Sequence, residues 1–168
     1  MIFIYLGPVV GGATARTVEG MSGVGARILR TRWLVRLPIP MMRAGLGPLF
    51  GGRLMLLQHT GRKSGRPRFV ALETVERPTA DRVVIASGFG EKAQWYRNLL
   101  AEPHCRVWIG RIRNRPAVAR VLDAAEASEV LERYRREHAK AYASLAQVIE
   151  EATGRSIQDI PYLEVQLA

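Results

Sequence analysis

The sequence predicts an α+β protein: a small, mostly antiparallel β-barrel of about six strands, with N-terminal helices and a C-terminal helical segment. Three observations predict this fold. Apolar and alternating runs recur at short spacing between residues 53 and 122, as in small barrels. A helical period then runs from Asp123 to Gly154. Alternation between Tyr162 and Leu167 predicts a final, half-buried strand.

The length of 168 residues and the hydrophobic content of 48% indicate one folded domain with a real core. We expect an N-terminal arm over residues 1–52 and a barrel domain over residues 53–168. The apolar start at residues 1–10 is shorter than the ~20 residues that span a bilayer, and no basic segment precedes it. The single cysteine, Cys105, excludes an internal disulfide. We therefore expect a cytoplasmic protein, with the inner face of the plasma membrane as an alternative place.

The N-terminal arm contains a predicted basic amphipathic helix over residues 21–37. Its cations are Arg27, Arg30, Arg32 and Arg36. Such a helix suits peripheral membrane contact or simple packing on the domain, and both interpretations stay open. Leu37–Pro40 breaks this helix, Pro40 can open a second short helix over Met41–Leu46, and Gly47-Pro48 ends that one.

The barrel strands follow from the apolar and alternating runs. They are predicted at Arg53–Thr60, Arg68–Val75, Arg82–Ala86, His104–Ile109 and Arg115–Leu122. A short helix fits Glu91–Ala101, and a basic turn fits Gly110–Asn114. Asp123 with Glu126 predicts a capping box at the start of the C-terminal helical segment, with a break near His138.

The stretch Thr60-Gly61-Arg62-Lys63-Ser64-Gly65-Arg66-Pro67-Arg68 lies between two predicted strands and predicts a tight, glycine-containing hairpin turn. It carries four cations in seven residues. Guanidinium forks and exposed backbone N–H groups suit phosphate or carboxylate oxygens. A solvated basic hairpin tip explains the same spacing, and both interpretations stay open.

The charge around this hairpin favours an anionic partner. Residues 20–72 hold ten cations and no acidic residue, whereas the rest of the chain carries 15 charges of each sign. The whole formal charge of +10 therefore lies in one region. A local basic field of this kind indicates an anionic ligand, a membrane surface or nucleic acid.

Several chemistries are excluded by missing motifs. The chain has no Gly-x-Gly-x-x-Gly that opens a helix and no Walker spacing. The three histidines, His59, His104 and His138, are far apart, so we expect no metal site. Ser87 lacks the glycines of a hydrolase elbow, and carboxylates are sparse in the β half. An enzyme with these residues would rely on a bound anionic cofactor.

Three motifs in order resemble the deazaflavin-dependent nitroreductase family. They are the hairpin of residues 60–68, the strand end Ala86-Ser87-Gly88, and Trp95-Tyr96-Arg97-Asn98-Leu99 followed by Pro103. The resemblance runs from about Arg53 to the C-terminus. It implies a split β-barrel that binds coenzyme F420, as in proteins best known from actinobacteria.

The resemblance also implies a set of cofactor-binding residues. Arg62, Lys63 and Arg68 would bind the phosphodiester and glutamate carboxylates of the cofactor tail, with Arg66 pointing outward. Ala86, Ser87 and Gly88 would lie along the deazaflavin ring or the phosphate. Trp95 and Asn98 would wall the cofactor, although core packing also explains Trp95.

Two positions depart from the family pattern. Gly88 stands where nitroreductase members often have lysine after the strand-end serine. Glu73 stands where an aromatic or apolar residue often lines the cofactor edge. An acid there disfavours an anionic neighbour unless an arginine pairs with it.

The implied reaction is hydride transfer from reduced F420 to an electron-poor small molecule such as a quinone, enone or nitro compound. Tyr134 and Tyr142, with His138, are candidates for substrate contact or proton donation, or for packing of the C-terminal helices on the barrel.

Alternatives to this reductase are a protein that binds F420 without turnover, a basic module for membrane or nucleic-acid surfaces, and a split-barrel FMN protein. Nucleic acid is disfavoured because no aromatic residues alternate with the hairpin cations. FMN is disfavoured because the hairpin resembles the deazaflavin group. The resemblance to split barrels also implies a homodimer.

Overall fold

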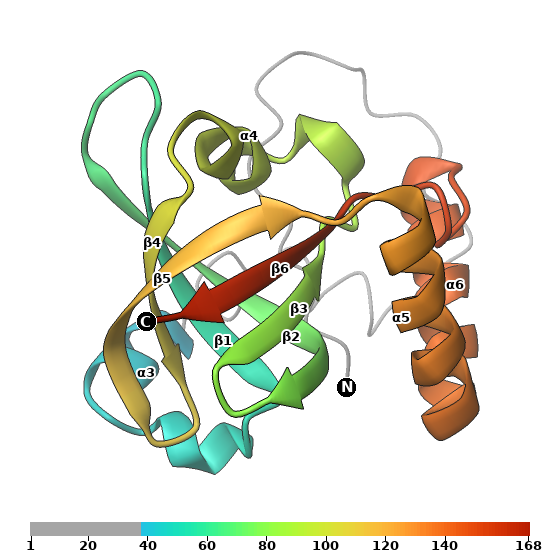
Figure 1. Cartoon of the computed structure of the whole chain (residues 1–168), viewed down its shortest axis with the longest axis horizontal. Helices are drawn as coiled ribbons and strands as arrows, with labels where there is room; N and C mark the ends of the chain where they lie inside the picture. The colour runs from blue at the N-terminus through green and yellow to red at the C-terminus, as the bar shows by residue number, and fades with distance from the viewer. Residues whose placement is uncertain (1–37) are drawn as a thin grey trace, which may run out of the picture.

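The computed structural model describes residues 38–168, in which six strands close into an antiparallel barrel (Figure 1). The strands are β1 (Leu54–Thr60), β2 (Pro67–Thr79), β3 (Arg82–Ala86), β4 (His104–Ile109), β5 (Ile112–Val121) and β6 (Tyr162–Leu167). Their order around the barrel is β1-β2-β3-β6-β5-β4. The predicted split β-barrel is confirmed, whereas the predicted helix at residues 21–37 lies outside the described residues.

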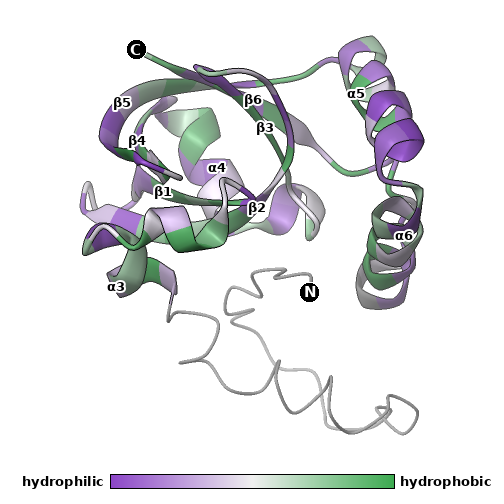
Figure 2. Cartoon of the chain, turned by 90° about the horizontal axis from the view of Figure 1, so that it is seen from below, coloured by the Kyte–Doolittle hydropathy of each residue, from purple (hydrophilic) through white to green (hydrophobic). Residues whose placement is uncertain are grey.

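Four α-helices and two short 3₁₀ turns accompany the barrel in this range. The helices are α3 (Pro38–Arg43), α4 (Gln94–Ala101), α5 (Ala124–Glu137) and α6 (Ala139–Thr153), and the 3₁₀ turns are η1 (Gly47–Phe50) and η2 (Gly90–Lys92). Helices α5 and α6 stand together at one side of the barrel, while α4 lies at its end (Figures 1 and 2). No described helix has both the length and the apolar character needed to cross a membrane.

The barrel interior is the main core, and α4 closes it at one end. Alternate residues of the strands point inward and are fully buried, as expected for period-2 patterns. From α4, the side chains of Trp95, Tyr96 and Leu99 join this cluster. Because these three side chains anchor α4, the other residues of the helix have fixed positions relative to the barrel.

A second apolar cluster joins α5 and α6 to the outside of β3 and β6. Its buried members are Val84, Leu122, Val130, Leu131, Ile149, Ile157, Ile160 and Tyr162. The predicted capping box at the start of α5 is confirmed, since the Glu126 N–H donates to Asp123 Oδ1 at 2.8 Å and the Asp123 N–H donates to Glu126 Oε2 at 3.0 Å. Arg133 of α5 also makes a two-pronged ion pair with Glu76 of β2, at 2.9 and 3.2 Å. This pair fixes the register of α5 against β2.

The predicted bounds of two strands are wrong. Strand β2 continues beyond Val75 to Thr79, through register shifts against β3, and β1 pairs with β2 only as far as Glu73. Pro78 is therefore tolerated, because a bulged edge does not require its missing N–H. Strand β5 begins at Ile112 because Asn114 adopts a positive φ of 52° at a bulge, which lets the strand continue through the predicted turn.

The predicted helix bounds also need correction. Helix α3 starts at Pro38 rather than Met41, since the first turn of a helix leaves its N–H groups unused and so accepts proline. Gly47-Pro48 opens η1 instead of only ending a helix. The segment predicted as one helix over Glu91–Ala101 divides into η2 and α4, because Ala93 is extended. Helix α3 buries Met42 against β1, so residues just before the barrel pack on it.

Candidate functional site

The β1–β2 hairpin is closed by backbone hydrogen bonds within its six-residue loop. The strands pair as far as Thr60 and Pro67. Within the loop, the Gly61 N–H donates to the Arg66 carbonyl at 2.9 Å, and the Gly65 N–H donates to the Gly61 carbonyl at 2.8 Å. Gly65 has a φ of +63°, a region that β-carbon sterics disfavour. The loop therefore has a defined shape that depends on this glycine.

Replacing Gly65 with alanine is expected to cost about 1 kcal/mol of unfolding free energy, because a β-carbon disfavours the left-handed region. No neighbouring atom lies within 4 Å of the new β-carbon, so the cost comes from the backbone alone. Gly65→Asn should cost less, since asparagine tolerates this region. Denaturant unfolding of both variants checks the order, and equal stability of wild type and Gly65→Ala would contradict it.

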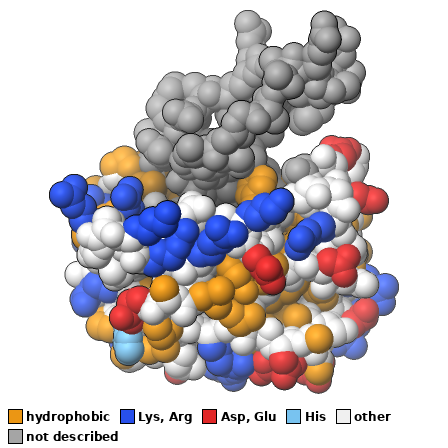
Figure 3. Space-filling model, turned by 90° about the horizontal axis from the view of Figure 1, so that it is seen from above, with side chains coloured by type: hydrophobic (Ala, Val, Ile, Leu, Met, Phe, Trp, Pro, Cys, Tyr) orange, Lys and Arg blue, Asp and Glu red, His pale blue; other side chains and the backbone are white. Residues whose placement is uncertain are grey.

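Three of the four hairpin cations are available to a ligand. Lys63, Arg66 and Arg68 are exposed, and their side chains make no hydrogen bond or ion pair with another residue in the described part of the chain. Figure 3 views the molecule from the hairpin and α4 side and shows a row of Lys and Arg side chains beside a hydrophobic patch. All three side chains are exposed, so their exposure does not test whether Arg66 alone points away from a cofactor, and that direction stays a prediction.

Arg62 differs from the other three because its polar groups are bound to α4. Its guanidinium donates to Asn98 Oδ1 at 2.9 Å and to Gln94 Oε1 at 3.0 Å. Its backbone N–H also donates to Asn98 Oδ1, at 3.2 Å. Arg62 therefore attaches the hairpin to α4, and its predicted contact with a cofactor stays a prediction.

His59 contacts the predicted site residue Asn98, and the sequence did not reveal this contact. It is only 5% exposed, and its Nδ1 lies 3.1 Å from Asn98 Nδ2. Burial is the main reason why its pKa falls from the ordinary value of 6.5 to about 4; a hydrogen bond with the Thr60 backbone opposes the fall, and the charge of Arg68 adds to it. In the sequence, a lone histidine after the apolar run Leu54–Leu57 gave no signal of this contact.

The loop after β3 is built around Ser87, which is fully buried. Its hydroxyl donates to the Gly90 carbonyl at 2.7 Å, and its N–H donates to the Pro161 carbonyl at 2.8 Å. Both polar groups are thus used within the protein. This geometry favours a role for Ser87 in shaping the loop, and direct contact with a cofactor stays a prediction.

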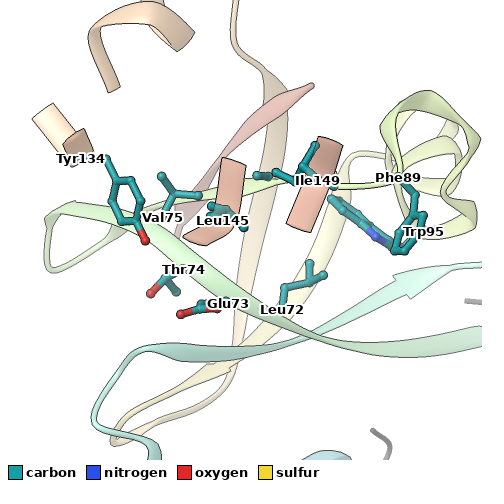
Figure 4. Close-up of a pocket in the computed structure, with 11 residues that line it drawn as sticks. Leu72, Glu73, Thr74, Val75, Phe89, Trp95, Tyr134, Leu145 and Ile149 are labelled. Atoms are coloured by element: carbon teal, nitrogen blue, oxygen red, sulfur yellow. The ribbon is translucent and has the colours of Figure 1, made fainter. Parts of the chain in front are cut away.

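A pocket lies between the barrel, the loop after β3, and the C-terminal helices (Figure 4). It is lined by Leu72, Glu73, Thr74, Val75, Ala86, Gly88, Phe89, Trp95, Tyr134, Leu145 and Ile149. The rings of Phe89 and Trp95 lie together at one end (Figure 4). At the other end, the hydroxyl of Tyr134 points toward Glu73 and Thr74 (Figure 4). The pocket is therefore apolar along most of its length and polar at one end.

The polar end combines a paired carboxylate with a neutral phenol. Glu73 lies 3.4 Å from Arg53, so an arginine pairs with this acid. Burial raises the pKa of Glu73, and Arg53 opposes that rise. Burial and the nearby charge of Glu73 raise the pKa of Tyr134. Tyr134 therefore keeps its proton at neutral pH and can donate a hydrogen bond into the pocket.

The structure brings together several residues that the sequence placed in the site. Ala86, Gly88, Trp95 and Tyr134 line one pocket, and Trp95 follows Gln94, which binds the hairpin through Arg62. Trp95 is 5% exposed and packs in the barrel core, while its predicted contact with a cofactor stays a prediction. Tyr142 instead packs against the α5–α6 cluster and does not line the pocket, so its substrate contact stays a prediction.

Comparison with known proteins agrees with these features. The family model for F420H(2)-dependent quinone reductase matches residues 40–158. A Mycobacterium tuberculosis (strain ATCC 25618 / H37Rv) protein named "Putative F420H(2)-dependent quinone reductase Rv3178" is 40% identical over 87 residues, which are 51% of this chain and 71% of that protein.

Two solved structures are similar in fold. One, described as a domain-swapped dimer, is 25% identical with a TM-score of 0.50, over 81% of this chain and 98% of that one. The other, described as an F420-H2 dependent reductase (FDR-A), is 26% identical with a TM-score of 0.48, over 68% of this chain and 94% of that one. Since the family model matches well over half of the 168 residues, the chain belongs to the F420H(2)-dependent quinone reductase family and is an F420-dependent oxidoreductase.

Proposed function

We propose that this protein reduces neutral, electron-poor small molecules, quinones first and enones or nitro compounds as further acceptors. The observation that carries the proposal is one apolar pocket joined through α4 to a hairpin with available cations. Reduced F420, when bound, supplies the hydride. The acceptor is proposed to lie against the pocket wall, where Trp95 and Phe89 exclude water.

The residues present fit F420. Its tail carries a phosphodiester and carboxylates, and Lys63, Arg66 and Arg68 are exposed cations on a hairpin of fixed shape. Its flat ring suits an apolar pocket that includes Ala86, with only a methyl side chain, and Gly88, with none, so the ring can approach closely. We propose that the hairpin holds the tail and that the strand end of β3 lies along the ring.

The polar end of the pocket is proposed to orient the acceptor. The Tyr134 hydroxyl would donate a hydrogen bond to an acceptor oxygen, and its raised pKa keeps the proton in place at neutral pH. Glu73 is the one charged side chain among the described lining residues. Its partner Arg53 is largely exposed and lies 3.4 Å away, so it offsets the charge of Glu73 only in part, and Glu73 still disfavours an anionic acceptor at that end. Together these residues favour neutral carbonyl or nitro compounds.

The test combines binding with turnover. Polarisation of F420 fluorescence during titration with the purified protein measures binding, and oxidation of F420H2 on addition of menadione, cyclohexenone or a nitroimidazole measures turnover. The proposal expects saturable binding and oxidation that saturates with menadione. Binding without oxidation by any acceptor would indicate a non-catalytic F420-binding protein. No binding at low salt would leave a basic surface module as the alternative.

Removing the charge of Glu73 is expected to relax selection against anionic acceptors. We expect Glu73→Gln to raise kcat/KM for 1,2-naphthoquinone-4-sulfonate about tenfold relative to that for neutral menadione, as a screened like charge predicts. In the wild type, the preference for neutral menadione over the anionic quinone should also fall as pH drops through the raised pKa of Glu73, because protonation neutralises the carboxylate. Steady-state kinetics of both quinones across pH checks this.

Glu150→Gln is the matched control, since Glu150 is exposed on α6 and does not line the pocket. It removes the same charge and should leave the ratio of the two quinones unchanged. An equal shift in both variants would assign the effect to net charge and contradict the role of Glu73.

We also propose a homodimer, supported by the similar structure described as a domain-swapped dimer. Light scattering on the purified protein tests this proposal, and a mass near 18.7 kDa across the concentration range would reject it.

A further inference from the structure

We propose that His59 and Asn98 form a buried latch that fixes the hairpin to α4, with His59 as a neutral positioning residue that carries its proton on Nε2. The inference rests on the proposed role of the hairpin in holding the F420 tail. His59 lies at the end of β1 and Asn98 in the middle of α4, 39 residues apart in the sequence. The latch would set the position of the hairpin before the cofactor arrives.

The orientation of the Asn98 amide follows from its partners. The oxygen Oδ1 receives two N–H groups from Arg62, one from the backbone at 3.2 Å and one from the guanidinium at 2.9 Å. Arginine only donates, so the amide oxygen must face the hairpin. The amide nitrogen Nδ2 therefore faces His59, at 3.1 Å from Nδ1.

The protonation state of His59 follows in turn. The Nδ2 group of Asn98 carries two hydrogens and cannot accept, so Nδ1 of His59 must offer its lone pair. Neutral imidazole with the proton on Nε2 satisfies this contact. A proton on Nδ1 would place two donors against each other in a site where both side chains are only 5% exposed.

The surroundings of His59 also favour its neutral form. Arg68 is its cross-strand partner on β2. The guanidinium of Arg62 binds the far side of the Asn98 amide. Both of these charged groups near His59 are positive. The group that α4 presents to the ring is the uncharged Asn98 amide. Burial, and after it the charge of Arg68, lowers the pKa of His59 to about 4 although a hydrogen bond with the Thr60 backbone raises it, so the ring is neutral at physiological pH.

The latch has a consequence for ligand binding. Asn98 holds both the backbone and the side chain of Arg62, the second residue of the loop, while Gln94 holds the far end of the guanidinium. Trp95, between these two helix residues, lines the pocket. The hairpin cations and the pocket wall therefore keep fixed positions relative to each other. A ligand that contacts both then loses less free energy to the ordering of loops and side chains.

Two substitutions of His59 separate the latch from mere packing. His59→Asn keeps an acceptor oxygen near the position of Nδ1, whereas His59→Leu keeps an apolar group of similar size and leaves Asn98 Nδ2 without its acceptor. We expect the Kd for F420 to rise about tenfold in His59→Leu and to stay within threefold of wild type in His59→Asn. Exchange of the Arg62 amide hydrogen should accelerate only in His59→Leu.

A spectroscopic readout on the wild-type protein tests the latch without any variant. The ¹⁵N chemical shifts of His59 should show an unprotonated Nδ1 and a protonated Nε2 from pH 8 to pH 5, both without F420 and with it. A proton on Nδ1, or titration near the ordinary pKa of 6.5, would overturn the latch. So would unchanged F420 affinity and unchanged Arg62 exchange in a folded His59→Leu protein. Failure of wild type to bind F420 would instead reject the proposed function, and the ¹⁵N shifts would still decide the latch.

Discussion

Removing the positive charges of Lys63 and Arg68 together will weaken F420 binding about 100-fold or more. Both side chains are exposed on the hairpin and make no ion pair with another described residue, so they can pair with the anionic cofactor tail. Each charge-assisted hydrogen bond contributes about 1.5–3 kcal/mol, and two of them correspond to this loss. The Kd from fluorescence polarisation, for wild type and for Lys63→Ala/Arg68→Ala, measures the effect.

The matched control is Arg136→Ala/Lys140→Ala, which removes two exposed cations near the junction of α5 and α6. It changes net charge by the same amount and should leave the Kd within about threefold, because distant surface charges are screened at physiological ionic strength. Equal losses in the two double variants would show that binding follows net charge and would contradict a site at the hairpin.

Between pH 7 and pH 4 the wild-type protein will lose about 3 kcal/mol of unfolding free energy that the His59→Asn variant does not lose. The pKa of His59 is lowered from 6.5 to about 4 on folding, chiefly by burial. Between these two pKa values His59 is protonated in the unfolded chain and neutral in the folded chain, so the free energy of unfolding falls as pH falls. A shift of about two and a half pKa units at ~1.36 kcal/mol each gives the expected size.

Urea unfolding at pH 7, 5.5 and 4 measures this loss as the difference between the two proteins. Using the difference removes the contribution of carboxylates that titrate in both, such as Glu126, whose pKa the Arg120 guanidinium lowers to about 2. Above about pH 7.5 the difference should be constant, because His59 is then largely neutral in both the folded and the unfolded state. Parallel curves down to pH 4 would show that His59 is not held neutral by the fold.

The sequence located most of the barrel because local patterns determine it. The bounds of β3 and β4 were predicted correctly, since one is an unbroken apolar run and the other alternates strictly. The ends of β2 and β5 were missed because bulges allow a strand to pass Pro78 and Asn114, and a bulge depends on the partner strand. Residue patterns alone do not reveal it.

The candidate site was only partly predictable for a similar reason. The motifs identified the hairpin, the β3 end and α4, and the fold brings them to one side of the barrel. The resemblance named Asn98 but not its partner His59, because that contact joins β1 to α4 across 39 residues. It also did not show that the Ser87 hydroxyl binds its own loop at Gly90 and that the Ser87 N–H binds Pro161 just before β6.

The most direct test of the site is a ¹H–¹⁵N correlation spectrum of the wild-type protein recorded during titration with F420. We expect shifts concentrated at three places: the hairpin of residues 61–68, the loop of residues 86–90, and the start of α4 at residues 94–98. Shifts confined to the outer surfaces of α5 and α6, or to the β4–β5 turn, would contradict it, whatever the affinity.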